Sequence, residues 1–166
     1  MEILQEPKNK IISFSLFKMK NMHIILLFLI FPLLGWNSLL YSQFTGKQSD
    51  WKGFKKTTFN VGEHEAFVVQ PNKTAEGMPW VWRARFPTFH TEIDEMLLAD
   101  GYHVAYINAG RRLGSPQALK VWEQFYTLLT EKHGLNKKVV LEGVSRGGLY
   151  VYRWVKAHPE TVAWMY

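Results

Sequence analysis

A short apolar segment that runs into a glycine-rich turn is the feature that most restricts how this chain can fold. The apolar, β-branched residues of Val139–Glu142 predict a buried strand. The next six residues are Gly143-Val144-Ser145-Arg146-Gly147-Gly148, and a helical pattern then runs from Leu149 to His158, just before a proline. A strand that turns sharply into a helix predicts an α/β architecture, in which strands and helices alternate.

The glycine-rich turn has the pattern Gly-x-Ser-x-Gly, which suits a nucleophilic serine. Gly143 and Gly147 remove side chains that would collide where the strand doubles back, and the turn holds Ser145 in a strained backbone conformation. Gly148 permits close helix-to-sheet contact or close approach of a substrate. A serine hydroxyl must be reached by a base on one side and by substrate on the other. We therefore predict that Ser145 is a catalytic nucleophile.

Two backbone N–H groups are predicted to bind the oxyanion of a tetrahedral intermediate. The N–H of Arg146 lies at the start of the predicted helix, where unpaired donors and the helix dipole favour negative charge. The second donor is expected from the loop after the third predicted strand, at Arg85-Phe86-Pro87. Because Pro87 has no N–H, the choice lies between Arg85 and Phe86, and we favour Phe86.

The rest of the chain predicts antiparallel strands followed by alternating helices and strands. Ser115 is expected to cap a long helix that has Pro116 in its first position and ends before Gly134. This order predicts N-terminal antiparallel strands that lead into a mostly parallel sheet flanked by helices. After a polar joint at 46–50, the other expected elements are strands at 55–61, 65–70, 80–85 and 102–107, a helix at 92–99, and a strand from 162 onward.

The composition excludes several classes of protein. An apolar content of 47% suits a packed core, and the net charge of +6 is spread along the chain, so no nucleic-acid partner is expected. There is no cysteine, which excludes disulfides, thiolate metal sites and a lipoprotein anchor. The glycine spacing fits neither nucleotide-binding fingerprint. No metal and no organic cofactor is therefore expected.

The N-terminus has the pattern of a secretion signal. An apolar run at 24–34 follows Lys18 and Lys20, and it is shorter than the roughly 20 apolar residues that span a membrane. We predict a signal segment at about 19–42, cut after Ser42, with residues 1–18 as an upstream extension. The protein is expected in the periplasm or outside the cell. A retained anchor is the alternative, so membrane contact is expected only through an uncleaved signal segment.

The segment Val139–Tyr150 resembles secreted bacterial α/β-hydrolases of the serine esterase and prolyl-oligopeptidase-like group. The strand Trp80–Arg85 and the helix start Gly114-Ser115-Pro116 are similar to the same group, and the likeness extends from about Phe54 to Tyr166. The resemblance implies a triad of serine, acidic residue and histidine, in that chain order. We interpret residues 43–166 as an incomplete α/β-hydrolase domain, truncated after the helix that follows the nucleophile, and expect this chain alone to be inactive.

Other polar side chains have substrate-contact or structural interpretations. His90 lies beside the predicted oxyanion loop and Arg111 follows the end of a strand, where α/β sheets bind ligands, so both are predicted to contact substrate. Carboxylates at the start of the helix at 92–99 are expected only to complement its dipole. These carboxylates are Glu92, Asp94 and Glu95. Structural roles are expected for His103, on a strand, and for His133 and His158, whose imidazolium forms suit helix C-termini.

Together these features predict an exported serine hydrolase that cleaves carboxylic esters through an acyl-enzyme on Ser145. The expected substrate is a small-molecule or carbohydrate-linked ester. Two alternatives stay open: a serine peptidase of prolyl-oligopeptidase type, and a non-catalytic binding module on a hydrolase scaffold. A downstream acid and histidine in the reading frame would support an enzyme, and their absence would support a binding module.

Overall fold

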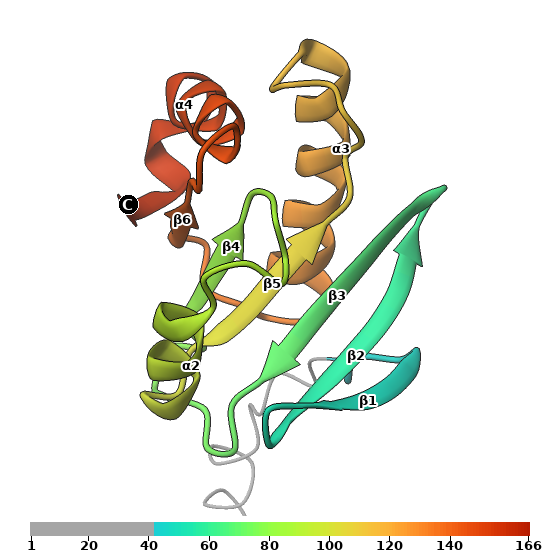
Figure 1. Ribbon diagram of the computed structural model, residues 1–166, viewed down its shortest axis with the longest axis vertical. Helices are drawn as coiled ribbons and strands as arrows, with labels where there is room; N and C mark the ends of the chain where they lie inside the picture. The colour runs from blue at the N-terminus through green and yellow to red at the C-terminus, as the bar shows by residue number, and fades with distance from the viewer. Residues whose placement is uncertain (1–41) are drawn as a thin grey trace, which may run out of the picture. The chain divides into compact units, whose positions relative to one another are not determined.

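The computed structural model describes residues 42–166, which fold around one seven-stranded mixed sheet (Figure 1). The predicted signal segment at about 19–42 lies outside the described residues, apart from Ser42. The strands lie in the order β1-β2-β3-β5-β4-β6-β7, antiparallel from β1 to β5 and parallel from β5 to β7. The strands are β1 (Lys47–Trp51), β2 (Phe54–Val61), β3 (His64–Gln70), β4 (Trp80–Arg83), β5 (His103–Ile107), β6 (Val139–Glu142) and β7 (Val162–Met165).

The helices connect the parallel strands, as the alternating sequence pattern predicts. They are α2 (Glu92–Ala99), α3 (Pro116–Thr127) with a π-helical extension (Leu128–Lys132), α4 (Gly147–Ala157) and a 3₁₀ turn (Pro159–Thr161). Ser115 caps α3 as predicted, since its hydroxyl accepts from the backbone N–H of Ala118 at 3.4 Å. The predicted order, N-terminal antiparallel strands that lead into parallel strands flanked by helices, is therefore confirmed, and three of the six strand pairings are parallel.

One strand is absent from the sequence prediction. The segment expected as a polar joint at 46–50 forms most of β1, which pairs with β2 from Lys47↔Thr58 to Trp51↔Phe54. As an edge strand with exposed side chains, β1 has no apolar face and no hydrophobic alternation to reveal it. It also shifts the numbering, so that the strand predicted as the third is the fourth in the structure.

The two faces of the sheet carry different side chains because successive residues of a strand point to opposite sides. On one face, Trp80 and Trp82 of β4 belong to a large core with the buried side chains of α3 and α4. On the other face, Val81 of β4 packs in a smaller core with Leu98 of α2. The helices therefore cover both faces, α2 on one and α3 with α4 on the other (Figure 1).

Tryptophan rings form the centre of the larger core. The Trp82 ring stacks on Trp122 of α3, with centroids 4.1 Å apart, and meets the edge of Trp154 of α4 at 5.0 Å. All three side chains are almost fully buried. One indole group thus joins the strand before the candidate oxyanion loop to the helix that follows Ser145.

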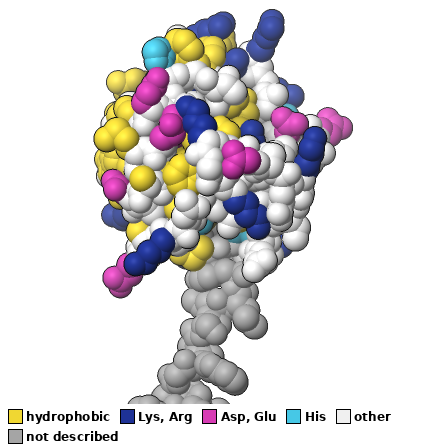
Figure 2. All heavy atoms as spheres, turned by 60° about the horizontal axis from the view of Figure 1, so that its bottom comes forward, with side chains coloured by type: hydrophobic (Ala, Val, Ile, Leu, Met, Phe, Trp, Pro, Cys, Tyr) yellow, Lys and Arg dark blue, Asp and Glu magenta, His cyan; other side chains and the backbone are white. Residues whose placement is uncertain are grey.

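The surface of the described residues mixes both signs of charge. On the face drawn in Figure 2, Lys and Arg side chains alternate with Asp and Glu, and apolar side chains gather along one side. None of the helices within 42–166 is long and apolar enough to cross a membrane.

Replacing Trp122 by alanine is expected to lower the free energy of unfolding by about 3–5 kcal/mol, because it opens a cavity between the sheet and two helices. Urea unfolding followed by circular dichroism measures the change. Trp164→Ala is the control, since Trp164 is 45% exposed and its loss is expected to cost less than about 1 kcal/mol. Similar losses for both variants would contradict the assigned core.

Candidate active site

The turn between β6 and α4 holds Ser145 as an exposed residue with a backbone φ of +51°. This left-handed conformation is uncommon for a residue with a side chain, and it is the strain predicted from the sequence. The turn is closed by hydrogen bonds from Gly147 N–H to the carbonyl of Val144 at 2.8 Å and from Gly148 N–H to that of Ser145 at 3.0 Å. These bonds place Ser145 directly before Arg146, the N-cap residue of α4.

The glycines around Ser145 are required by close packing. A Cβ added to Gly143 would lie 3.1 Å from the Cα of Gly148, where the strand and helix approach each other. A Cβ added to Gly147 would lie 3.3 Å from the Cβ of Ala84, in the loop after β4. Both distances are tighter than ordinary van der Waals contact. Side chains at these positions would push the turn away from its neighbours.

The loop after β4 brings Phe86 beside this turn. Ala84 N–H donates to the carbonyl of Glu142 at 3.0 Å, and the guanidinium of Arg146 lies 5.9 Å from the Phe86 ring centroid. Within residues 42–166, the backbone N–H groups of Phe86 and Arg146 donate to no acceptor. The two donors predicted for an oxyanion thus lie on neighbouring loops and are free to bind a ligand oxygen.

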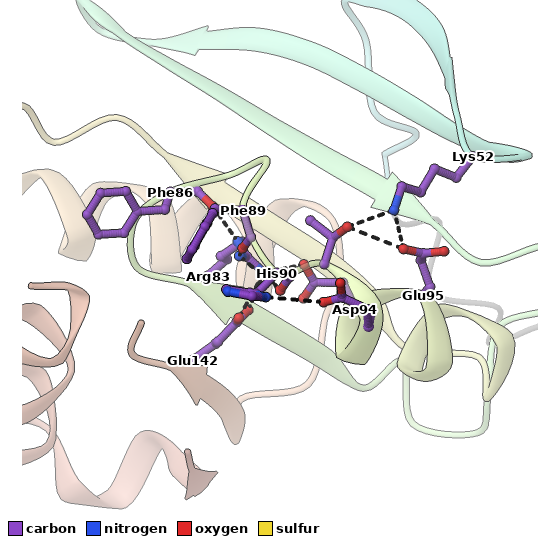
Figure 3. Close-up of polar contacts among 10 residues, drawn as sticks. Lys52, Arg83, Phe86, Phe89, His90, Asp94, Glu95 and Glu142 are labelled. Atoms are coloured by element: carbon purple, nitrogen blue, oxygen red, sulfur yellow. Dashed lines mark hydrogen bonds and ion pairs between the residues drawn. The ribbon is translucent and has the colours of Figure 1, made fainter. Parts of the chain in front are cut away.

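The buried side chain of Arg83 holds the loop that carries Phe86 in place through hydrogen bonds to its carbonyl groups (Figure 3). Its Nε donates to the carbonyl of Phe86 at 3.0 Å, and Nη2 donates to the carbonyls of Phe89 and His90. Three carbonyls on one planar guanidinium leave the loop little freedom. Phe86 and His90 both have positive φ, at +52° each, so the loop follows an uncommon backbone path that Arg83 stabilises.

Arg83 also pairs with two buried carboxylates. Arg83 and Glu142 are neighbours in the parallel register of β4 and β6, so their side chains leave the same face of the sheet. Arg83 Nη1 lies 2.8 Å from Glu142 Oε1 and 2.5 Å from Asp94 Oδ2, on the α2 side. Asp94 therefore does more than complement the helix dipole, and the expectation for it is wrong. The neighbouring Glu95 instead pairs with Lys52 at the β1–β2 turn.

One guanidinium cannot neutralise two buried carboxylates. Burial and the nearby charge of Asp94 raise the pKa of Glu142 to about 8, and burial also raises the pKa of Asp94 despite Arg83. The pair therefore retains a proton at neutral pH. Burial, followed by the charge of Glu142, raises the pKa of the Tyr166 hydroxyl as well. A sequence signal for this network exists: Arg83 and Glu142 each end an otherwise apolar strand.

The two predicted substrate-contact residues lie in different hollows. His90, with a side chain 67% exposed, lines a hollow of about 300 Å³ together with Gly143, Val144 and Tyr166. Arg111 lines a separate hollow of about 360 Å³, shared with Arg85, Leu113 and Arg146. The structure therefore brings Arg111, and not His90, beside the residue that follows Ser145.

The remaining histidines lie in structural positions. His103 is buried on β5, and burial lowers its pKa to about 4, so it is neutral. Burial also lowers the pKa of His133, whose Nδ1 lies 2.6 Å from the carbonyl of Ser42, and this shift opposes the imidazolium form that would suit a helix C-terminus. His158 Nε2 lies 3.3 Å from Glu123 Oε1 at the end of α4. In the described part of the chain, no histidine bonds to Ser145 and no acidic or histidine cluster could hold a metal.

Comparisons with known proteins give matches among solved structures. No family model matches the chain, and no curated protein matches it. An acetyl xylan esterase from Aspergillus awamori matches with a TM-score of 0.53 and 16% identity, over 66% of this chain and 50% of that one. A dienelactone hydrolase from Anabaena variabilis matches with a TM-score of 0.51 and 19% identity, over 71% of this chain and 62% of that one.

A cold-adapted esterase from an Arctic intertidal metagenomic library matches with a TM-score of 0.51 and 12% identity, over 75% of this chain and 64% of that one. The chain thus spans between half and just under two thirds of the length of these three proteins. At these identities the likeness shows the fold alone.

The free energy of unfolding is expected to fall as the pH rises from about 5 to 8. Glu142 holds its proton in the folded state up to about pH 8, whereas an unfolded glutamic acid releases it near pH 4.3. Glu142→Gln cannot ionise and should flatten this decline, as measured by urea unfolding at pH 5.5, 7 and 8.5. Glu76→Gln, at an exposed loop carboxylate, is the control and should keep the wild-type slope. Equal slopes for wild type and Glu142→Gln would refute the assignment.

Proposed function

Since the chain has the α/β-hydrolase fold, we propose that it supplies the nucleophile and the oxyanion donors of an exported serine hydrolase that cleaves carboxylic esters. The observation that carries the proposal is the backbone of Ser145, which has a φ of +51° on an exposed turn between β6 and α4. Strain of this kind persists only where the surrounding structure imposes it, and it gathers at functional sites.

The proposed reaction proceeds in two steps. The Ser145 hydroxyl oxygen attacks the ester carbonyl carbon while a base takes its proton, and the carbonyl oxygen becomes an oxyanion that accepts from the N–H groups of Arg146 and Phe86. The C–O bond to the alcohol breaks, the alcohol takes the proton, and an acyl-enzyme remains. Water then repeats the sequence, releasing the acid and restoring Ser145. The family resemblance implies that the base is a histidine oriented by an acidic residue, both later in chain order than Ser145.

Arg83 contributes by positioning. Its three carbonyl contacts fix the loop that presents the Phe86 N–H, and its ion pair with Glu142 ties that loop to the strand preceding Ser145. Donors that are already in place cost no reorganisation during the reaction, which makes them effective for an oxyanion. The buried network therefore supports catalysis without touching the substrate.

Two other functions share this fold. A serine peptidase of prolyl-oligopeptidase type would use the same nucleophile on an amide, and a binding module would keep the scaffold without turnover. The matched structures include an acetyl xylan esterase and a dienelactone hydrolase, which favours ester cleavage as the first candidate. Export rests on the signal pattern of residues 19–42.

A fluorophosphonate probe is expected to label Ser145 in the full protein encoded by the reading frame that contains this sequence. Only a hydroxyl activated by a neighbouring base attacks phosphorus at a useful rate. Mass spectrometry of the labelled peptide identifies the site. Ser145→Ala should abolish both labelling and turnover of 4-nitrophenyl acetate, with a loss of roughly 10⁶-fold in kcat for a nucleophile of this type.

Ser49→Ala is the matched control, because Ser49 is an exposed serine on the edge strand β1, far from the turn in sequence, and this variant should be labelled at Ser145 and turn over like wild type. Circular dichroism checks that both variants fold. Wild-type turnover by Ser145→Ala would exclude Ser145 as the nucleophile, and an unlabelled, folded wild type would favour the binding module.

A further inference from the structure

We propose that the hollow lined by Arg85, Arg111 and Arg146 binds a carboxylate of the substrate, so that the preferred ester carries a negative charge near its scissile bond. This inference rests on the proposed function for the ester chemistry. The binding of the anion itself depends only on the hollow and its three guanidinium groups.

The three arginines come from three separate segments of the chain. Arg85 lies in the loop after β4, Arg111 in the loop after β5, and Arg146 in the turn after β6. These loops follow the carboxyl ends of parallel strands, where α/β sheets bind their ligands. Leu113 completes the lining of the hollow, which measures about 360 Å³ and therefore has room for a carboxylate with part of its carbon skeleton.

The positive charge in this hollow has no protein counter-charge. No carboxylate within residues 42–166 forms an ion pair with any of the three arginines, and the hollow is lined by no acidic residue. Arg85 donates from Nη1 to the carbonyl of Gly110 at 3.0 Å, but its Nε is buried and meets no acceptor among the described residues. Buried donors are normally satisfied, so the unpaired Nε points to a missing acceptor.

Arg83, two residues earlier in the chain, differs from Arg85 in having its charge paired. Two carboxylates balance its charge, and its nitrogens donate to these carboxylates and to backbone carbonyls. Arg85 donates instead to the carbonyl of Gly110 and forms no ion pair among residues 42–166, so its charge stays available. The same short segment therefore holds one arginine that builds the loop and one that is free to bind a ligand.

The walls of the hollow are fixed before any ligand arrives. The Tyr150 hydroxyl of α4 donates to the carbonyl of Gly110 at 2.8 Å and accepts from the N–H of Leu113 at 3.0 Å, which ties the Arg111 loop to α4. The Phe86 ring lies 5.4 Å from the guanidinium carbon of Arg85 and 5.9 Å from that of Arg146. The backbone that carries Arg111 is therefore held in place before an anion binds, which reduces the entropy lost on binding.

The chemistry of the lining selects a carboxylate close to the ester. A planar guanidinium binds a carboxylate through two parallel hydrogen bonds, and several guanidiniums in a concave site concentrate positive potential there. Arg146 follows Ser145 directly, so an anion held by its side chain lies a short distance from the carbonyl that Ser145 attacks. The carboxylate can belong to the acyl part or to the alcohol part of the ester, and the test distinguishes the two.

The test compares two matched pairs of substrates with the full protein. In the acyl pair, 4-nitrophenyl hydrogen succinate is compared with its neutral methyl ester. In the alcohol pair, 4-carboxyphenyl acetate is compared with 4-(methoxycarbonyl)phenyl acetate. After subtraction of the buffer rate, kcat/KM is expected to be about tenfold higher or more for the charged member of one pair, as a charge-assisted hydrogen bond provides. The pair that shows the preference identifies the part of the ester that carries the carboxylate.

Arg111→Gln should remove most of that preference by lowering kcat/KM for the charged member, because it removes one of the three guanidinium groups that line the hollow. Arg112→Gln removes the same charge from the next residue, which does not line the hollow, and should retain the preference. An active enzyme without preference for the charged member in either pair would overturn the inference while leaving the proposed function intact.

If the full protein hydrolyses none of these esters, a binding measurement tests the carboxylate site independently of the proposed hydrolase function. In Ser145→Ala, isothermal titration should show monomethyl succinate binding about tenfold more tightly than dimethyl succinate, with a difference that shrinks as salt is raised from about 0.05 to 0.5 M. Equal affinity for the two compounds would overturn the carboxylate site. Tight binding of the anion by a protein that hydrolyses no ester would retain the site and refute the hydrolase.

Discussion

The buried guanidinium of Arg83 is the constraint on which the rest of the candidate site depends. It lies between β4, β6 and α2, bonded to two carboxylates and to three carbonyls of the loop that carries Phe86. A charge out of water is tolerated only when its hydrogen bonds and its counter-charges are supplied by the protein. Because these partners come from β6, α2 and the loop, satisfying the one side chain on β4 fixes the relative positions of all four segments.

Successive side chains of each strand point to opposite faces of the sheet, so the two faces differ in character. Trp82 and Leu141 point to the face covered by α3 and α4, whereas Arg83 and Glu142, one residue later, point to the face covered by α2. The aromatic face holds the long helices in place by burial, and the ionic face holds the oxyanion loop by directed bonds. Ser145 lies between β6, which carries Glu142, and α4, which packs in the aromatic core. Burial and ion pairing therefore stabilise the two elements on either side of Ser145.

The charges around the turn are also unevenly distributed. Behind the oxyanion loop, Asp94 and Glu142 outnumber Arg83 and keep a proton to compensate. In front of it, the arginines of the hollow have no acidic partner among the described residues. A site arranged in this way attracts anions on its open side, while the buried side contributes rigidity. The solved structures that share the fold are too distant to assign this feature, which belongs to the residues of this chain.

Local sequence determined the elements whose signals are local. Ser115 and Pro116 mark a helix start because a cap and a fixed φ act within one turn, and the glycines beside Ser145 mark the sharp turn because they act on their own backbone. The sequence could not reveal β1, whose edge position leaves no apolar pattern.

Tertiary structure alone decided which polar side chains meet. Asp94 resembles any carboxylate at a helix start until the sheet register places it against Arg83. Arg111 and Arg146 are 35 positions apart in the printed sequence, and only the parallel order of β5, β4 and β6 brings their loops to one hollow. The physical reason is that periodicity and turn chemistry act over a few residues, whereas charge pairing and the shape of a binding site depend on strands that are distant in sequence and adjacent in the sheet.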